Sequence, residues 1–301
     1  MKVHIDFETR STVDIWESGA WVYSAHPSTK ILCVATAVDG DKVEISTDYR
    51  SLTALAENPD AIFVAHNAIF EQCIWKNIMV PQYGLPPIPI QRWRCTMAKA
   101  CAYGLPKALG KAADALNLGS EKDKAGRGIM LRMAKPLKKG GNEYDDSPAN
   151  YKLLFEYCKQ DVRVERDLDN RLPDLSKIEQ EIWFYDQLIN MRGVSVDMES
   201  VKTFISILEN KTEQLNKELV SITGGKVTKG TQVASMLTFL NEGGAGMTTL
   251  DKQSVAEAIK ANKLTPQQIQ ILRLRQQLGK SSLAKYKKLV DAAQKYLDTT
   301  G

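Results

Sequence analysis

Asp6 and Glu8 stand two positions apart near the start of the chain, in a segment from Val3 to Glu8 that alternates apolar and polar residues. Such alternation predicts a half-buried strand, because successive side chains of a strand point to opposite faces. Both carboxylates therefore leave the same face, where each raises the pKa of the other unless a cation neutralises them. The pair indicates a site for a hard divalent ion such as Mg²⁺ or Mn²⁺, although an exposed edge strand with ordinary surface acids would show the same pattern.

Two later segments carry further carboxylates at helical spacing. Asn67 follows an apolar run at 61–64 that predicts a buried strand, and its side chain can cap the next helix. Glu71, four residues on, should then project from the same helix face as Asn67. Tyr157 and Asp161 are also four residues apart, within a segment whose apolar residues recur with helical period. Each pair alone is weak evidence, because a Tyr and an Asp at that spacing are usually a surface pair.

In this order, the patterns Asp-x-Glu-Thr at 6–9, Asn-x-x-x-Glu at 67–71 and Tyr-x-x-x-Asp at 157–161 resemble the three motifs of the DEDD 3′–5′ exonucleases, in the tyrosine (DEDDy) subclass. The chain is most similar to the proofreading domain of phage-type family A DNA polymerases. Further matches lie at 94–98, 104–109 and 122–126, and the resemblance covers roughly residues 1–175. One position departs from the pattern: the second motif usually ends in Asp, whereas Glu71 is one methylene longer.

The resemblance implies an α/β, RNase H-like exonuclease fold in which a mixed sheet of about five strands has helices on both faces. It also implies two divalent metal ions, Mg²⁺ or Mn²⁺. Asp6, Glu8 and Asp161 would bind the first ion, Asp6 would bridge to the second, and Glu71 would hold the second directly or through water. Tyr157 would orient the attacking water.

Four neighbours of these motifs are candidates for contacts with the nucleic acid: Thr9, His66, Asn67 and Phe70. Each has a structural alternative, because Thr9 can end the strand, Asn67 can cap a helix and Phe70 can belong to the core. His66 lacks metal-ligand spacing to another His or Cys, so we expect a local packing or hydrogen-bonding role, with the cleft lining as a further possibility.

The implied activity is metal-dependent removal of nucleotides from the 3′ end of DNA, releasing nucleoside 5′-monophosphates. Single-stranded or frayed 3′ ends should be preferred, because a strand must leave its base pair to reach a cleft. Two alternatives stay open. One is an RNA-trimming exonuclease of the ribonuclease D type, and the other is a DNA-binding polymerase fragment without catalysis.

Composition agrees with an enzyme that works inside the cell. The 301 residues suggest two domains, and the 43% of hydrophobic residues can bury a substantial core. The five cysteines, which lack Cys-x-x-Cys spacing, are expected to be reduced thiols. We find neither a signal peptide nor an apolar stretch long enough for a membrane, so we expect no membrane partner and a cytoplasmic location, in the bacterial host if the protein is phage-encoded.

The pattern changes to helical after Leu172-Pro173-Asp174, which predicts domains at 1–175 and 176–301. Apolar residues recur at helical spacing between Ile178 and Ile189, Asp197 can cap a long helix to about residue 222, and shorter helices are expected near 231–241 and 251–261. A final helix is expected at about 265–297.

The second domain resembles the thumb-like start of a family A polymerase region. Residues 201–301 have a net charge of +7 while the first 200 have −3, which suits a part that contacts phosphates, although scattered lysines on a solvated surface would give the same excess. Later polymerase motifs are not found, so no polymerase activity is expected. The chain should be a polymerase fragment or half of a split enzyme, and the remaining polymerase part, in the same or a separate chain, is an expected partner.

Overall fold

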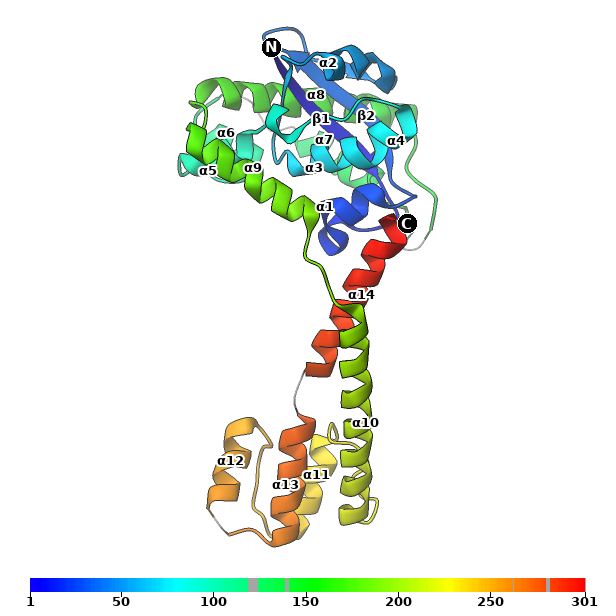
Figure 1. Cartoon of the computed structure of the whole chain (residues 1–301), viewed down its shortest axis with the longest axis vertical. Coiled ribbons are helices and arrows are strands. Elements are labelled where there is room, and N and C mark those ends of the chain that lie inside the picture. Colours follow the sequence, from blue (N-terminus) through cyan, green and yellow to red (C-terminus); the bar gives the residue numbers. More distant parts are fainter. Residues whose placement is uncertain (119–123, 139–140, 262, 280–281, 301) are drawn as a thin grey trace. The chain divides into compact units, whose positions relative to one another are not determined.

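The computed structural model describes residues 1–118, 124–138, 141–261, 263–279 and 282–300 (Figure 1). These residues fold into two compact units, Met1–Val194 and Ser195–Asp298. The first unit extends beyond the boundary expected after residue 175. The reason is that the helix α9 (Lys177–Arg192) packs on the first unit, where Trp183 joins the core. The matching segment at 122–126 lies partly outside the described residues.

The first unit is built on one mixed five-stranded sheet of order β3-β2-β1-β4-β5. β1 pairs antiparallel with β2 and parallel with β4, β2 pairs antiparallel with β3, and β4 pairs parallel with β5. The strands are β1 (Lys2–Arg10), β2 (Lys30–Val38), β3 (Glu44–Ser46), β4 (Ile62–Ala65) and β5 (Trp93–Cys95). This sheet, covered by helices on both faces, confirms the α/β architecture expected for an RNase H-like exonuclease.

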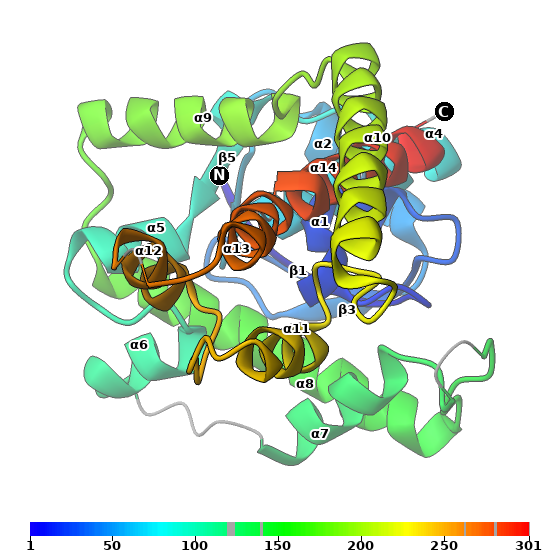
Figure 2. The same ribbon diagram turned by 90° about the horizontal axis from the view of Figure 1, so that it is seen from below.

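Short helices connect the strands, and one long helix, α8 (Pro148–Arg171), crosses the sheet. The other helices of this unit, besides α9, are α1 (Ile15–Ala25), α2 (Thr53–Glu57), α3 (Ile69–Ile74), α4 (Val80–Tyr83), α5 (Thr96–Ala102), α6 (Leu109–Ala115) and α7 (Lys124–Met133), with the tighter or wider turns η1 (Tyr49–Leu52), η2 (Trp75–Met79) and η3 (Ile90–Arg92). Figure 2 shows the same arrangement after a turn of 90°.

The alternation of β1 separates an apolar face from a polar one. Val3, Ile5 and Phe7 are buried in a core that also contains Trp75 of η2 and Trp183 of α9. The opposite face of the sheet packs on α8, whose Leu154, Cys158 and Val162 enter a second core with β2. Because these two cores hold β1 on both sides, its polar side chains are pressed against α8.

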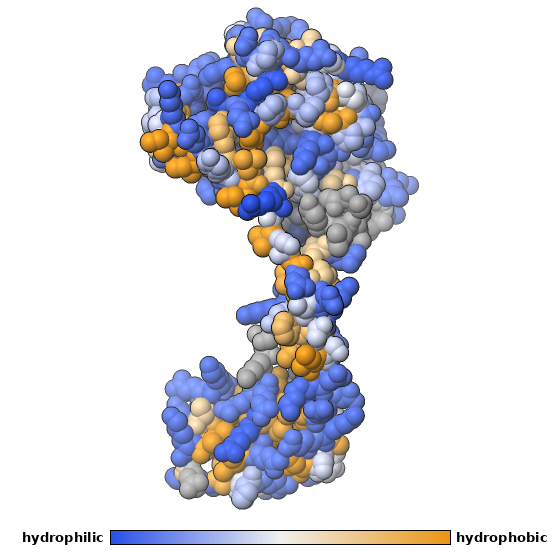
Figure 3. Space-filling view, in the orientation of Figure 1, coloured by the Kyte–Doolittle hydropathy of each residue, from blue (hydrophilic) through white to orange (hydrophobic). Residues whose placement is uncertain are grey.

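The helix predicted after residue 176 is confirmed, but the face that it buries differs from the expected one. The apolar residues that predicted α9 are exposed, with values from 45% for Leu188 to 70% for Ile178, while Trp183 is only 9% exposed. Arg94 lies over the ring of Phe184, 5.5 Å from its centroid. Aromatic contacts with the first unit therefore orient α9, and hydrophobic side chains remain on the surface over this helix (Figure 3).

The remaining helices are α10 (Met198–Thr223), α11 (Val233–Glu242), α12 (Lys252–Lys260), α13 (Pro266–Leu278) and α14 (Ser282–Thr300). Asp197 caps α10 through the amide of Ser200, as the sequence predicted, and Gly224 ends that helix with a left-handed φ of 59°. The single helix expected at 265–297 is wrong, because α13 ends with Gly279 as its C-cap. No described helix is long and apolar enough to cross a membrane.

Candidate metal centre

The polar face of β1 meets α8 in a row of paired ionisable side chains. Alternate residues of a strand lie about 6.6 Å apart. Residues four apart on a helix rise by about 6 Å. The two elements can therefore pair step by step along their length. Two pairs follow this step along β1, Lys2 with Asp169 at 2.6 Å and His4 with Glu165 at 2.7 Å. Asp6 contacts Cys158, seven residues before Glu165, at 3.4 Å.

Opposite charges balance the row at one end, and carboxylates accumulate at the other. Asp169 also forms a 2.5 Å ion pair with buried Lys99, so Lys99 and Lys2 together neutralise its charge. Farther along β1, Asp6 lies near Asp161 of α8. Burial, and then the charge of Asp161, raise the pKa of Asp6 to about 7. An acid that keeps its proton to neutrality in the absence of a cation is typical of a site built to hold one.

Glu8 and Glu71 complete the group of four carboxylates. Burial raises the pKa of Glu8 well above its usual range, and the charges of Asp6, Asp161 and Glu71 add to the effect. Burial and the charge of Asp6 likewise raise the pKa of Glu71. The structure thus brings Asp6, Glu8, Glu71 and Asp161 together from β1, α3 and α8.

Glu71 is buried at 2% exposure, and its Oε2 atom finds no hydrogen-bond partner among the described residues. A buried carboxylate oxygen without a partner is costly unless a cation or water satisfies it. This atom and the mutual repulsion of the carboxylates fit the hard divalent ions that the sequence suggested, whose preferred ligands are oxygens. Divalent ions would be held by these four residues.

Tyr157 lies one helical turn before Asp161 on α8, as predicted, and a hydrogen bond joins the two side chains. Burial is the largest cause of a raised Tyr157 pKa, followed by the charges of Asp161 and Glu8. The phenol therefore keeps its proton at neutral pH, so it can position a neighbouring group by hydrogen bonding but cannot serve as a ready base.

The helix cap, one of the two roles considered for Asn67, is wrong. Ala68 is the residue before α3, and no side chain caps this helix. Asn67 instead adopts a left-handed φ of 68°, for which Asn is one of the better-suited residues, and its side chain is exposed. Asn67 and Glu71 consequently do not share a helix face: Asn67 faces solvent, whereas Glu71 is buried.

The other three candidates for nucleic-acid contact are held by the protein itself. The Thr9 hydroxyl lies 2.9 Å from that of Tyr23, and Phe70 packs beside the Tyr23 ring with centroids 6.1 Å apart. His66 Nε2 donates to the Lys107 carbonyl at 2.8 Å, and its Nδ1 lies 3.0 Å from the Thr96 hydroxyl. Burial lowers the His66 pKa, so the neutral ring with its proton on Nε2 is favoured. The hydrogen-bonding role expected for His66 is confirmed.

Two residues of this centre, Glu165 and Cys158, were not predicted. Acids recur every four residues at 161, 165 and 169, which matches the spacing of the alternate polar residues of β1. The sequence alone does not show that α8 packs on β1, so this repeat could not be linked to the site. Cys158 contacts both Asp6 Oδ2 at 3.4 Å and the Asp6 carbonyl at 3.6 Å. One ligand atom each from Asp6, Glu8 and Cys158 lie within 4.8 Å of one another.

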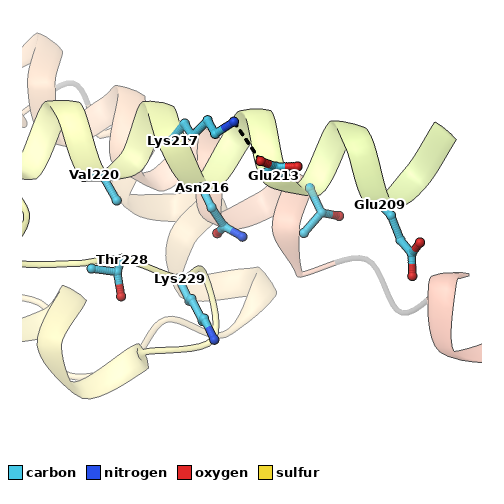
Figure 4. A pocket seen from close by; sticks show the side chains of 8 residues that line it. Glu209, Glu213, Asn216, Lys217, Val220, Thr228 and Lys229 are labelled. Atoms are coloured by element: carbon cyan, nitrogen blue, oxygen red, sulfur yellow. Dashed lines mark ion pairs between the residues drawn. The ribbon is translucent and has the colours of Figure 1, made fainter. Parts of the chain in front are cut away.

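A surface hollow of about 430 Å³ lies elsewhere, between α10 and the segment that follows it (Figure 4). Lys217 and Glu213 form an exposed 2.7 Å ion pair on its wall, and Asn216 accepts a hydrogen bond from the Gly230 amide. Glu213, Asn216 and Lys217 are thus engaged by partners within the protein. We therefore assign no chemistry to this hollow, and the carboxylate group remains the candidate site.

The chain resembles part of a known phage protein in sequence. No family model matches the chain. The chain is 35% identical over 299 residues to a DNA polymerase of Bacillus phage SP02, a match that covers 94% of this chain and 45% of the phage protein. The chain therefore spans less than half the length of that relative. Among solved structures, the catalytic core of RRP6 from Trypanosoma brucei (mutant C496S) matches with a TM-score of 0.37 and 12% identity over 92% of this chain and 74% of that one. Along nearly its whole length, the chain is similar in sequence to part of a phage DNA polymerase.

Proposed function

We propose that this chain is a metal-dependent 3′–5′ DNA exonuclease of the proofreading type, which releases nucleoside 5′-monophosphates. The observation that carries the proposal is the meeting of Asp6, Glu8, Glu71 and Asp161 from three separate elements, with Tyr157 bonded to Asp161. Structural ion pairs join acids to bases, whereas these acids raise one another's pKa. A bound cation would relieve this repulsion, so the arrangement favours cation binding.

The four carboxylates would bind two divalent ions. Asp6, Glu8 and Asp161 would hold one ion, and Asp6 together with Glu71 would hold the second. When bound, two such ions supply an activated water and stabilise the leaving oxygen of a phosphodiester. Tyr157 would position the attacking water. Its protonated hydroxyl would form a hydrogen bond with this water and hold it in line with the phosphorus atom.

DNA is proposed as the substrate because the chain is similar to part of a DNA polymerase. Residues 195–298 would form the start of a polymerase region, and the lysine-rich composition after residue 200 suits contacts with phosphates. Exposed Asn67 is the best placed of the four candidates to contact a terminal nucleotide, while Thr9, His66 and Phe70 would act by shaping the surface beside it. The remaining polymerase part is a proposed partner.

The test is the digestion of 5′-labelled single-stranded DNA and of an RNA of the same sequence, each with Mg²⁺ or Mn²⁺. DNA should shorten from its 3′ end one nucleotide at a time, and mass spectrometry should identify nucleoside 5′-monophosphates. Asp161→Asn, which keeps the size of the side chain but removes its charge, is the matched control and should be inactive.

The outcomes separate the alternatives. Faster digestion of RNA than of DNA would favour an RNA-trimming enzyme over the proofreading proposal. Release of no mononucleotide from either substrate, by a protein that still binds DNA, would favour a non-catalytic polymerase fragment.

A further inference from the structure

Cys158 occupies an unusual place for a core cysteine, because its thiol points into the carboxylate group. The residue is fully buried, and its Sγ atom lies 3.4 Å from Asp6 Oδ2. The ligand atoms of Asp6, Glu8 and Cys158 form a set within 4.8 Å. A second thiol is close, since Cys33 pairs with Glu8 across the β1–β2 ladder and hydrogen-bonds Cys158.

An independent feature indicates that a cation belongs here. Buried Glu71, whose charge raises the pKa of Glu8, leaves its Oε2 atom without a partner among the described residues. The centre therefore has an unsatisfied oxygen beside a mixed set of oxygen and sulfur donors. Sulfur is a poor ligand for Mg²⁺ but a preferred one for zinc-type ions.

We propose that Asp6, Glu8 and Cys158 form a site for a thiophilic divalent ion of the Zn²⁺ or Cd²⁺ class, with the Cys158 sulfur as a direct ligand. The inference rests on the proposed function only in sharing Asp6 and Glu8 with it. Binding breaks the S–H bond of Cys158, forms a metal–sulfur bond and releases one proton to solvent, with no electron transferred.

The geometry suits this coordination. Zinc binds thiolate sulfur at about 2.3 Å and carboxylate oxygen at about 2.1 Å, so sulfur and oxygen in a tetrahedral site lie about 3.6 Å apart. The distance from Cys158 Sγ to Asp6 Oδ2 is already 3.4 Å. Three protein ligands leave a fourth position for water or substrate, as in zinc sites that remain open.

The consequence concerns which ion the centre holds. A zinc-type ion bound by Cys158 occupies Asp6 and Glu8, and so excludes Mg²⁺ from the oxygens that it needs. Cys158 thereby sets the ion preference of the site, and Zn²⁺ or Cd²⁺ at low concentration should compete with Mg²⁺ or Mn²⁺.

The test follows Cd²⁺ binding by the ultraviolet thiolate-to-cadmium charge-transfer band, which reports sulfur ligation directly. The wild-type chain should show the band at one Cd²⁺ per molecule. Cys158→Ser should lose the band and bind Cd²⁺ more weakly. Loss of an outer-shell contact already weakens metal binding by about 10–100-fold, so loss of a direct ligand should weaken it by at least as much. Its Mn²⁺ affinity, measured by electron paramagnetic resonance, should change by less than about threefold because Mn²⁺ prefers oxygen ligands.

Two further variants make the result specific. Cys101→Ser, at an exposed cysteine, is the matched control and should keep the band. Asp6→Asn keeps all five cysteines but should weaken Cd²⁺ binding, and this expectation can be tested even if Cys158→Ser fails to fold.

No band in the wild-type chain, a band that survives in Cys158→Ser, or Cd²⁺ affinity unchanged in Asp6→Asn would overturn the inference. If Mn²⁺ still supports hydrolysis in that case, the proposed exonuclease stands. The reverse result, a Cys158-dependent band without any nuclease activity, would support the inference and contradict the proposed function.

Discussion

Replacing Asp6 by asparagine should stabilise the metal-free protein at neutral and higher pH while abolishing nuclease activity. The carboxyl of Asp6 has its pKa raised from 3.8 to about 7, first by burial and then by the charge of Asp161. In the unfolded chain the same carboxyl loses its proton near its ordinary pKa. Between these two values the folded protein binds more protons than the unfolded chain, so the free energy of unfolding falls as pH rises through this window.

The size of this loss follows from the shift. Each pKa unit corresponds to about 1.4 kcal/mol, so the ionisation of Asp6 costs the folded protein up to about 4 kcal/mol once the pH exceeds its folded pKa. This is an upper bound, because Asp161 shares the repulsion and relaxes when Asp6 becomes neutral. The amide of the Asp6→Asn variant cannot ionise and still offers an oxygen to the Cys158 thiol, so we expect a gain of about 1–4 kcal/mol.

The assay is urea denaturation with a chelator present, at about pH 4.5 and about pH 8, for wild type and Asp6→Asn. The variant should exceed the wild type by at most about 1 kcal/mol in unfolding free energy at the lower pH, because little of the shift is expressed there, and by clearly more at the higher pH. Asp60→Asn, at an exposed acid, is the control and should show no such change. A difference that is constant with pH, or a variant less stable at about pH 8, would refute the assignment of Asp6 to a repulsive cation-binding group.

Three other predictions concern Tyr157, Glu71 and the second unit. Tyr157→Phe should slow hydrolysis by about 10–1000-fold with metal affinity unchanged, since the hydroxyl positions water; equal losses in rate and in affinity measured by titration would contradict this role. Glu71→Asp should keep activity within about tenfold of wild type, whereas Glu71→Gln should lose about a hundredfold or more across a magnesium series, because charge matters more than length; a Gln variant as active as the Asp variant would place Glu71 outside the site. Truncation after Val194, where the first unit ends, should weaken DNA binding and flatten its salt dependence; unchanged affinity in a filter-binding assay would argue against phosphate contacts by the second unit.

Local patterns predicted the elements that carry the site. The alternation from Val3 to Glu8 is enough to predict β1 and the shared face of its two carboxylates, because strand periodicity is a property of the backbone. The helix that spaces Tyr157 and Asp161 by one turn is predicted equally well. Asp197, Gly224 and the pair Thr265 and Pro266 mark helix ends through local hydrogen bonds and fixed backbone angles.

Long-range packing decided the features that the sequence did not predict. Whether Asn67 caps a helix depends on a left-handed turn between β4 and α3. The buried face of α9 depends on where Trp183 and Phe184 find aromatic and cationic partners. Cys158 and Glu165 gain their roles only when α8 crosses β1, and a residue's neighbours across such a contact cannot be deduced from its own segment.

The proposed activity depends above all on Asp6, Glu8, Glu71 and Asp161 forming a centre for two divalent ions. The measurement that tests this most directly is anomalous diffraction at the manganese edge, from crystals grown with Mn²⁺ and a nucleoside 5′-monophosphate. We predict two peaks among these carboxylates, about 3.5–4 Å apart, with the phosphate bound between them and the Tyr157 hydroxyl beside it. Crystals with ordered side chains and a bound nucleotide but no anomalous peak between Asp6 and Asp161 would contradict a two-ion centre.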